Sequence, residues 1–122
     1  MENQFEKLDA WKKAHQLVLL VYRITYNFPK EERFSLTDQL RRAAVSIAAN
    51  IAEGNIRFSK KEFAQYIYIA KGSLEESKYY FILAYDLKYI SFAEYKKLQN
   101  LSIECGKLIT GFLRYLKLNT KV

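Results

Sequence analysis

Residues 39–54, QLRRAAVSIAANIAEG, decide the fold class of this chain. Apolar side chains return within this stretch every three or four residues, at Leu40, Ala43, Ile47 and Ile51. That spacing places them on one face of an α-helix, because a helix completes a turn in about 3.6 residues. The stretch also ends in a glycine, which commonly follows the last turn of a helix. It therefore predicts a helix with one buried face.

Three further helices are predicted outward from this stretch. Two begin with sequences of the form Ser-x-x-Glu, at residues 59–62 and 91–94, in which hydroxyl and carboxylate accept hydrogen bonds from free amides of the first turn. Residues 35–38 form a weaker signal of the same kind, and Pro29 ends the segment before it. The resulting prediction is four helices, at residues 9–28, 35–56, 60–89 and 92–117.

The composition suits one all-α domain. The chain has 122 residues, enough to bury a core, and it contains only one proline and four glycines, which leaves few turns between long elements. Predicted connections of about two to seven residues make consecutive helices antiparallel neighbours. We expect an antiparallel up-and-down four-helix bundle as a single domain over residues 1–122, with residues 1–8 and 118–122 as flexible ends.

The first and third predicted helices carry more apolar side chains than one buried face requires. In the first, further apolar residues join a predicted core seam of Trp11, Ala14, Val18, Val21, Thr25 and Phe28. Such an arc covers roughly half of the helix, against the ~100° of a typical surface helix. Because extended apolar surface usually marks an interface, we expect self-association; the alternative is a wide bundle in which these residues flank the core. The interface candidates are Leu17, Leu20, Ile24, Ile69, Tyr80, Leu83 and Leu87.

Positive charge is concentrated in the last predicted helix. The formal net charge is +7, and residues 91–122 hold six lysine and arginine side chains against two glutamates. The basic residues that share the sector opposite the apolar seam are Lys96, Lys107, Arg114, Lys117 and Lys121. Such a stripe suits contact with a phosphate backbone; the alternative is a solvated face that keeps the protein soluble. Tyr68, Tyr79 and Tyr89, each near a lysine, are candidates for stacking on bases or for packing.

Polar residues of the quoted stretch and the turn after it form a second candidate site. They recur at spacings of three or four and therefore share one column of the helix: Gln39, Arg42, Ser46, Asn50, Glu53 and Arg57. Small alanines flank the column and allow close approach. One interpretation is a hydrogen-bonded network between helices or subunits, in which the charged members find partners. The other is a surface that binds phosphate or a partner protein.

Nothing in the sequence assembles into a catalytic centre. Common nucleotide-binding, zinc-protease and nucleophile-elbow motifs do not occur, and His15, the only histidine, has no cysteine or carboxylate close by. We expect no enzymatic activity, no metal and no other cofactor. Cys105 is the only cysteine, and its apolar neighbours predict a buried, reduced thiol. Neither a signal peptide nor a membrane-spanning run is visible, so we expect a cytoplasmic protein without a membrane partner.

Three motifs carry a resemblance to a known family. They are Phe28-Pro29, the pattern Gln39-x-x-Arg42-Ala-Ala-x-Ser46-Ile-x-x-Asn50-Ile-Ala-Glu53-Gly54, and Gly72-Ser73-Leu-Glu75. With them the chain, from Trp11 to about Leu116, closely resembles the bacterial four-helix-bundle proteins encoded in intervening sequences of large-subunit ribosomal RNA genes. That family looks like the accessory variability protein of diversity-generating retroelements, a pentameric barrel that binds nucleic acid and a reverse transcriptase. The resemblance implies a homopentamer with basic residues on a nucleic-acid surface, and it brings no catalytic residues.

Two hypotheses of function remain, from different classes. The first is a non-enzymatic homo-oligomer that associates with RNA or DNA, with basic side chains on phosphates and no base-specific contacts. The second is an oligomeric adaptor, for example for a reverse transcriptase or another polymerase, that does not itself bind nucleic acid. Salt discriminates between them, because phosphate contacts weaken steeply with salt and packed apolar anchors do not.

Overall fold

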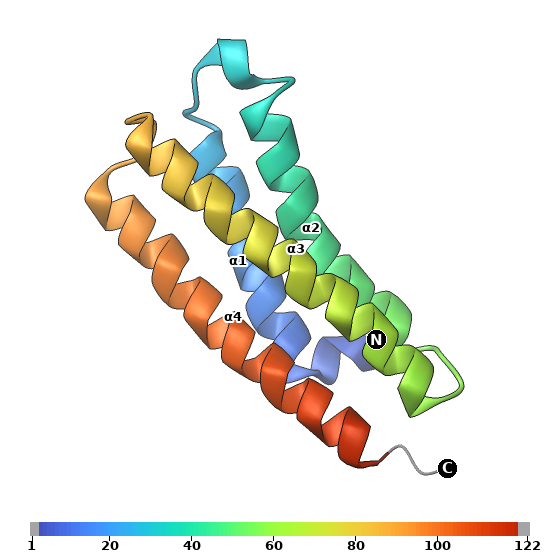
Figure 1. Ribbon diagram of the computed structural model, residues 1–122. Helices are drawn as coiled ribbons and strands as arrows, with labels where there is room; N and C mark the ends of the chain where they lie inside the picture. The colour runs from blue at the N-terminus through green and yellow to red at the C-terminus, as the bar shows by residue number, and fades with distance from the viewer. Residues whose placement is uncertain (1–2, 120–122) are drawn as a thin grey trace.

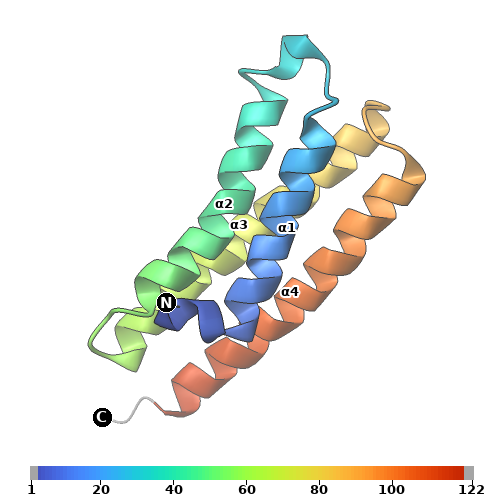
Figure 2. The ribbon, with the colours of Figure 1, turned by 180° about the vertical axis from the view of Figure 1, so that it is seen from behind.

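The computed structural model describes residues 3–119, which form an antiparallel four-helix bundle (Figures 1 and 2). Its helices are α1 (Asp9–Thr25), α2 (Leu36–Gly54), α3 (Lys60–Asp86) and α4 (Phe92–Leu118). Two short 3-10 helices, η1 (Gln4–Lys7) and η2 (Lys30–Glu32), precede α1 and α2. The predicted all-α, up-and-down four-helix bundle is confirmed.

The helices pack as a ring. Each contacts its neighbour in sequence, and α1 also packs against α4, which closes the bundle. The α1–α2 and α3–α4 loops lie at one end, and the α2–α3 loop lies at the other with η1 and the end of α4 (Figures 1 and 2). The described chain therefore enters and leaves the bundle at the same end.

Local hydrogen bonds explain where α3 and α4 begin. The Ser59 hydroxyl accepts a bond of 3.1 Å from the Glu62 amide. Ser91 and Glu94 bond each other's amides reciprocally, at 3.1 and 2.8 Å. The predicted starts at 60 and 92 are confirmed. Ser35 does not cap α2 in this way.

Glu32 caps α2 instead. Its carboxylate accepts hydrogen bonds from the Ser35 hydroxyl at 2.6 Å and from the Leu36 amide at 3.2 Å. It also accepts one from the Tyr89 hydroxyl at 2.8 Å, which ties the start of α2 to the α3–α4 loop. These three bonds lower the pKa of Glu32, the Ser35 hydroxyl contributing most. A carboxylate from η2, one turn upstream of the expected serine, thus does the capping.

Three helices end earlier than predicted. α1 ends at Thr25 rather than at residue 28, because Phe28 precedes a proline and is disfavoured in helical geometry. α2 ends at Gly54 rather than at residue 56. α3 ends at Asp86 rather than at 89, since Lys88 adopts a left-handed φ of 66°. The Tyr89 amide then bonds the Ala84 carbonyl at 2.9 Å, which terminates the helix in the geometry usually given to glycine.

Two of the residues predicted to form an oligomer interface lie in the core of the bundle. Leu17 and Ile24 were assigned to a second, exposed face of α1, but they are buried at 0% and 6% exposure. That assignment is wrong: the centre of the apolar arc faces the core, while Trp11 and Val18 from the predicted seam pack at its edge. Leu20, Tyr80 and Leu83 are half-buried against the core, and Ile69 and Leu87 remain exposed at 52% and 46%.

Secondary structure extends into both segments that are expected to be flexible ends. Residues 4–7 form η1, and the Phe5 ring meets the Trp11 ring edge-on at a centroid distance of 5.2 Å. At the other end, α4 extends through residue 118. Residues 1–2 and 120–122 lie outside the described part of the chain. Within residues 3–119, none of the helices combines the length and apolar character that a membrane crossing needs.

Candidate nucleic-acid interface

A groove of about 570 Å³ runs along the contact between α3 and α4. The α3 wall includes Lys71, Glu75 and Lys78, and the α4 wall includes Lys107 and Arg114. Because the two long helices pack antiparallel, cations of α3 and cations of α4, which are distant in sequence, lie on one surface. Sequence patterning on one helix at a time does not show this combination.

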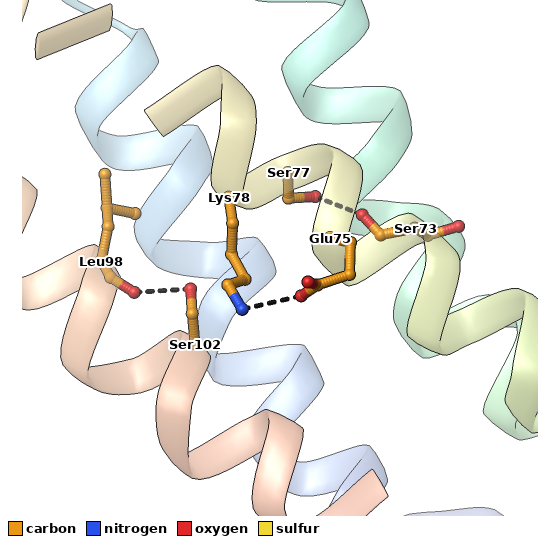
Figure 3. Close-up of polar contacts among 6 residues, drawn as sticks. All are labelled: Ser73, Glu75, Ser77, Lys78, Leu98 and Ser102. Atoms are coloured by element: carbon orange, nitrogen blue, oxygen red, sulfur yellow. Dashed lines mark hydrogen bonds and ion pairs between the residues drawn. The ribbon is translucent and has the colours of Figure 1, made fainter. Parts of the chain in front are cut away.

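Three of the four cations in the groove have no acidic partner among the described residues. Glu75, the carboxylate in the lining, is paired with Lys78 at 2.7 Å (Figure 3). Lys71, Lys107 and Arg114 form no ion pair with any residue between 3 and 119. The groove therefore presents a net positive charge that an anion can neutralise.

Small residues contribute to the lining of the groove on α4. Gly106 and Gly111 carry no side chain, and a Cβ at Gly111 would meet nothing within 4 Å. Ser102 also lines the groove, but its hydroxyl donates to the Leu98 carbonyl at 2.7 Å (Figure 3). Ser77, buried on α3, likewise donates to the Ser73 carbonyl at 2.8 Å. Binding potential in the groove therefore comes from its cations and not from these hydroxyls.

A second hollow of about 400 Å³ continues the groove toward the end of α4. It shares Lys71 and Arg114 with the groove and adds Tyr68 and Lys117. The Lys117 ammonium lies 5.6 Å from the centre of the Tyr68 ring, which is 46% exposed. An exposed ring beside a cation is a surface on which a nucleic-acid base can stack.

The predicted basic stripe is only partly assembled in this groove. Lys107, Arg114 and Lys117 line the two adjoining hollows. Lys96 lines neither and donates to Gln99 on its own helix at 3.0 Å. Lys121 lies outside the described residues. Lys71 of α3, which the sequence places only beside the stacking candidate Tyr68, joins the α4 cations through the packing of the two helices.

The polar column of α2 divides into three local sets of contacts. Two are ion pairs between successive turns, Arg42 with Asp38 at 3.0 Å and Arg57 with Glu53 at 2.9 Å. The Arg57 guanidinium also stacks 4.5 Å from the centre of the Tyr66 ring. Gln39, at the other end, is exposed. The charged members thus find partners on or next to their own helix.

The centre of the column joins α2 to α3. The Ser46 hydroxyl accepts hydrogen bonds from Ser73 at 2.8 Å and from the Asn50 amide at 3.0 Å. Asn50 additionally donates to the Ser46 carbonyl at 2.8 Å. These contacts agree with the interpretation of the column as a network between helices.

The remaining singled-out residues do not form a reactive site. His15 is exposed and stacks on Trp11, with ring centres 4.9 Å apart. Cys105 is buried as predicted, and burial raises the pKa of its thiol to about 12. No group of three or more metal-ligating side chains occurs in the part of the chain that the structure describes.

Fold and groove together define a helical-bundle protein with an unneutralised cationic surface. The sequence matches the family model described as "23S rRNA-intervening sequence protein" over residues 6–111. The chain therefore belongs to the 23S rRNA-intervening sequence protein family. A comparison with curated protein sequences gave no match.

A solved structure has the same fold. It is the 1.70 Å crystal structure of a protein of unknown function from the S23 ribosomal protein family of Bacteroides thetaiotaomicron. The alignment covers 86% of this chain and 95% of that one, at 24% sequence identity and a TM-score of 0.78. At this identity the likeness establishes the four-helix architecture alone.

Proposed function

We propose that this protein is a non-enzymatic nucleic-acid-binding protein that holds phosphates in the groove between α3 and α4. The observation that carries the proposal is a set of three cations that share one groove and have no acidic partner within residues 3–119: Lys71, Lys107 and Arg114. Lys117 extends the same surface beside Tyr68. Membership of a family named for ribosomal RNA genes is compatible with an RNA ligand.

The spacing of these cations suits a phosphate backbone. Lys107 and Arg114 are two helical turns apart, or roughly 10 Å along the axis. At this separation the two side chains can contact different phosphates of one strand. Arginine can grip a phosphate through two parallel N–H bonds, whereas lysine acts as a point charge. Such contacts depend on the charge and the spacing of the phosphates and give no preference for particular bases.

The salt dependence of binding tests the proposal. We suggest fluorescence anisotropy with a labelled single-stranded RNA of mixed sequence, titrated with protein between about 50 and 200 mM salt. The test variant is Lys107→Gln with Arg114→Gln. Its matched control is Lys12→Gln with Arg23→Gln, which removes the same charge from exposed positions of α1 outside the groove.

The expected result is a change in slope as well as in affinity. Each lost phosphate contact on a single strand flattens the plot of log K against log salt by about 0.7, so the groove variant flattens it by about 1.4. The control variant should keep the wild-type slope. If both double variants bind and titrate alike, the groove is not the binding site and the proposal is wrong.

We further propose that the protein is a homo-oligomer, with five copies as the resemblance to the retroelement protein implies. Support comes from exposed apolar side chains on one sector of α3, Ile69 and Leu87, beside half-buried Tyr80 and Leu83. Because water-exposed apolar surface favours association, a second copy is a suitable cover. Repetition of the groove around an oligomer would also strengthen its field.

Native mass measurement tests the assembly at micromolar protein concentration. The 14.4 kDa chain should be recovered as a multiple, with five copies as the specific expectation. Ile69→Lys should reduce the assembled mass, whereas Leu19→Lys should not, although both side chains are 52% exposed in the single chain. A wild-type monomer, or equal dissociation by both variants, contradicts the proposed interface.

The same apolar surface favours a second candidate function, an adaptor that binds a polymerase-type protein. In that case the affinity for the partner should change little with salt, because packed apolar anchors carry the binding energy. Absence of RNA binding in the anisotropy assay, together with loss of partner binding in Ile69→Lys, would favour the adaptor over the nucleic-acid-binding protein.

A further inference from the structure

A separate hollow of about 410 Å³ is lined by residues of the α1–α2 loop and of the turns next to it. Figure 1 shows that this loop lies at one end of the bundle. The hollow is bounded by the end of α1, by the loop with η2, and by the first turns of α2. The groove between α3 and α4 shares no lining residue with it. The two surfaces are therefore independent.

The lining of this hollow is cationic. Lys30, Arg33 and Arg41 all contribute to it, and none of the lining residues is acidic. Within residues 3–119 these three side chains form no ion pair. The acids closest in sequence are engaged elsewhere or do not line it: Glu32 binds Ser35 and Tyr89, and Glu31 is exposed.

Arg41 is held in place before any ligand arrives. Its Nε donates to the Thr25 hydroxyl at 2.8 Å, and Thr25 is 3% exposed and donates in turn to the Val21 carbonyl at 2.7 Å. The guanidinium also lies 4.5 Å from the centre of the Tyr22 ring. These contacts fix the side chain while leaving its Nη hydrogens for the hollow, so little rotamer freedom remains to be lost on binding.

Thr37 contributes a hydroxyl donor to the hollow. The residue is 8% exposed and lines the hollow, and its hydroxyl forms no hydrogen bond with any residue from 3 to 119. Among the described residues, its oxygen is not one of the fully buried polar atoms that lack a partner, so the hydroxyl reaches the accessible surface. It can therefore donate to an acceptor oxygen of a ligand in the hollow.

We propose that this hollow binds the terminal phosphate of a nucleotide or of a nucleic-acid strand. Three cations and one hydroxyl donor match a dianionic phosphate monoester with three acceptor oxygens, and the guanidinium forks match its geometry. Tyr26, 83% exposed at the rim, offers a ring for the attached base. A free nucleotide and a strand end share this chemistry, and the experiment below separates them.

Nuclear magnetic resonance titration of ¹⁵N-labelled protein at low salt tests the site. The probes are adenosine 5′-monophosphate, adenosine, and one short oligonucleotide with either a 5′-phosphate or a 5′-hydroxyl. The signals to follow are the Thr37 amide and the Arg41 Nε–H. Adenosine 5′-monophosphate should move both signals, and adenosine should move neither.

Variants connect the signals to the lining residues. Arg33→Gln should weaken monophosphate binding about tenfold or more, the effect of one charge-assisted hydrogen bond. Thr37→Val, which keeps the side-chain shape, should weaken it a few-fold. Arg23→Gln removes a charge from an exposed position of α1 outside the hollow and should leave binding within about twofold. The Lys107→Gln, Arg114→Gln variant should bind the monophosphate as wild type does.

The outcomes are distinct from those of the groove experiment. A preference for the 5′-phosphorylated over the 5′-hydroxyl oligonucleotide supports the site and identifies a strand end as the ligand. Monophosphate binding without a response to either oligonucleotide supports the site and identifies a free nucleotide. An equal response to both oligonucleotides shows that internal phosphates bind and overturns the terminal-phosphate assignment. Any one of three further results overturns the proposal. The Thr37 and Arg41 signals stay unchanged with all probes, adenosine binds as well as its monophosphate, or Arg33→Gln and Arg23→Gln weaken binding equally.

Discussion

Gly54 lies at a close contact between α2 and α3, and replacing it with alanine should destabilise the bundle. A Cβ at Gly54 would lie 2.8 Å from Phe63 Cδ1 and 2.8 Å from Tyr66 Cβ. Favourable carbon contacts are about 3.5–4.0 Å. The Phe63 ring can rotate away, but Tyr66 Cβ moves only with the α3 backbone, so the added methyl group must push the helices apart.

The expected magnitude is a balance of two opposing terms. Overpacking a well-packed core costs typically about 1–3 kcal/mol. Alanine has a higher helix propensity than glycine by up to ~1 kcal/mol, and less at the last residue of a helix. We therefore expect Gly54→Ala to lower the free energy of unfolding by about 1–2 kcal/mol. In a chain of this size that lowers Tm by several degrees.

Gly111→Ala is the matched control, since a Cβ there meets nothing within 4 Å and the residue lies inside α4. This variant should be more stable than wild type by roughly 0.5–1 kcal/mol. The assay is urea unfolding followed by far-ultraviolet circular dichroism, at one protein concentration because association shifts apparent stability. If Gly54→Ala is as stable as wild type, or if both variants are stabilised equally, steric contact does not explain the glycine.

Three further predictions follow from contacts described above. Lys88→Gly should raise the free energy of unfolding by ~1 kcal/mol, because glycine adopts the left-handed φ of 66° without steric cost; urea unfolding measures this, and a destabilised variant contradicts it. With its thiol pKa raised to about 12 by burial, Cys105 should react with a disulfide reagent at neutral pH only after denaturation, and a fast reaction of native protein refutes this. Hydrogen bonds lower the pKa of Glu32 in the folded protein below its ordinary value of 4.5. Their stabilisation of the fold is complete at pH values above 4.5 and is lost as the pH falls through the lowered pKa of the folded state. The difference in urea midpoint between wild type and Glu32→Gln should therefore become smaller in acid. A difference that stays constant with pH would show that the Glu32 carboxylate does not stabilise the fold through these hydrogen bonds.

Helix starts were predictable from sequence because their signals are local. Ser59 and Ser91 cap with partners three residues away, and both partners are visible in the sequence. The end of α3 was not predictable, since it depends on a lysine in a conformation that sequence rules reserve for glycine or asparagine. The start of α2 depends on Glu32, whose third partner, Tyr89, is distant in sequence.

The orientation of α1 was harder to predict than its existence. Because apolar residues cover about half of its circumference, periodicity does not decide which part of the arc faces inward. Leu17 was therefore assigned outward, although it is fully buried. Ile69 and Leu87, placed on the outer face of the third predicted helix, are exposed.

About half of the candidate groove was predictable. The α4 cations recur on one sector of a single helix, which a sequence pattern reveals. Lys71 joins them only through the antiparallel pairing of α3 with α4. The neutralisation of Glu75 by Lys78 is equally invisible to a charge count, because it depends on side-chain geometry.

The shared location of the two described chain ends has a practical consequence. An even number of antiparallel helices brings residues near 3 and 119 to the same end of the molecule (Figures 1 and 2). A short linker between them would permit circular permutation, with new termini opened in the α3–α4 loop. Since α1 and α4 already pack together, the permuted chain would make the same helix contacts in a different chain order. The α1–α2 loop, which borders the hollow of about 410 Å³, would stay uncut, and an affinity tag at the new termini would lie away from the α2–α3 end.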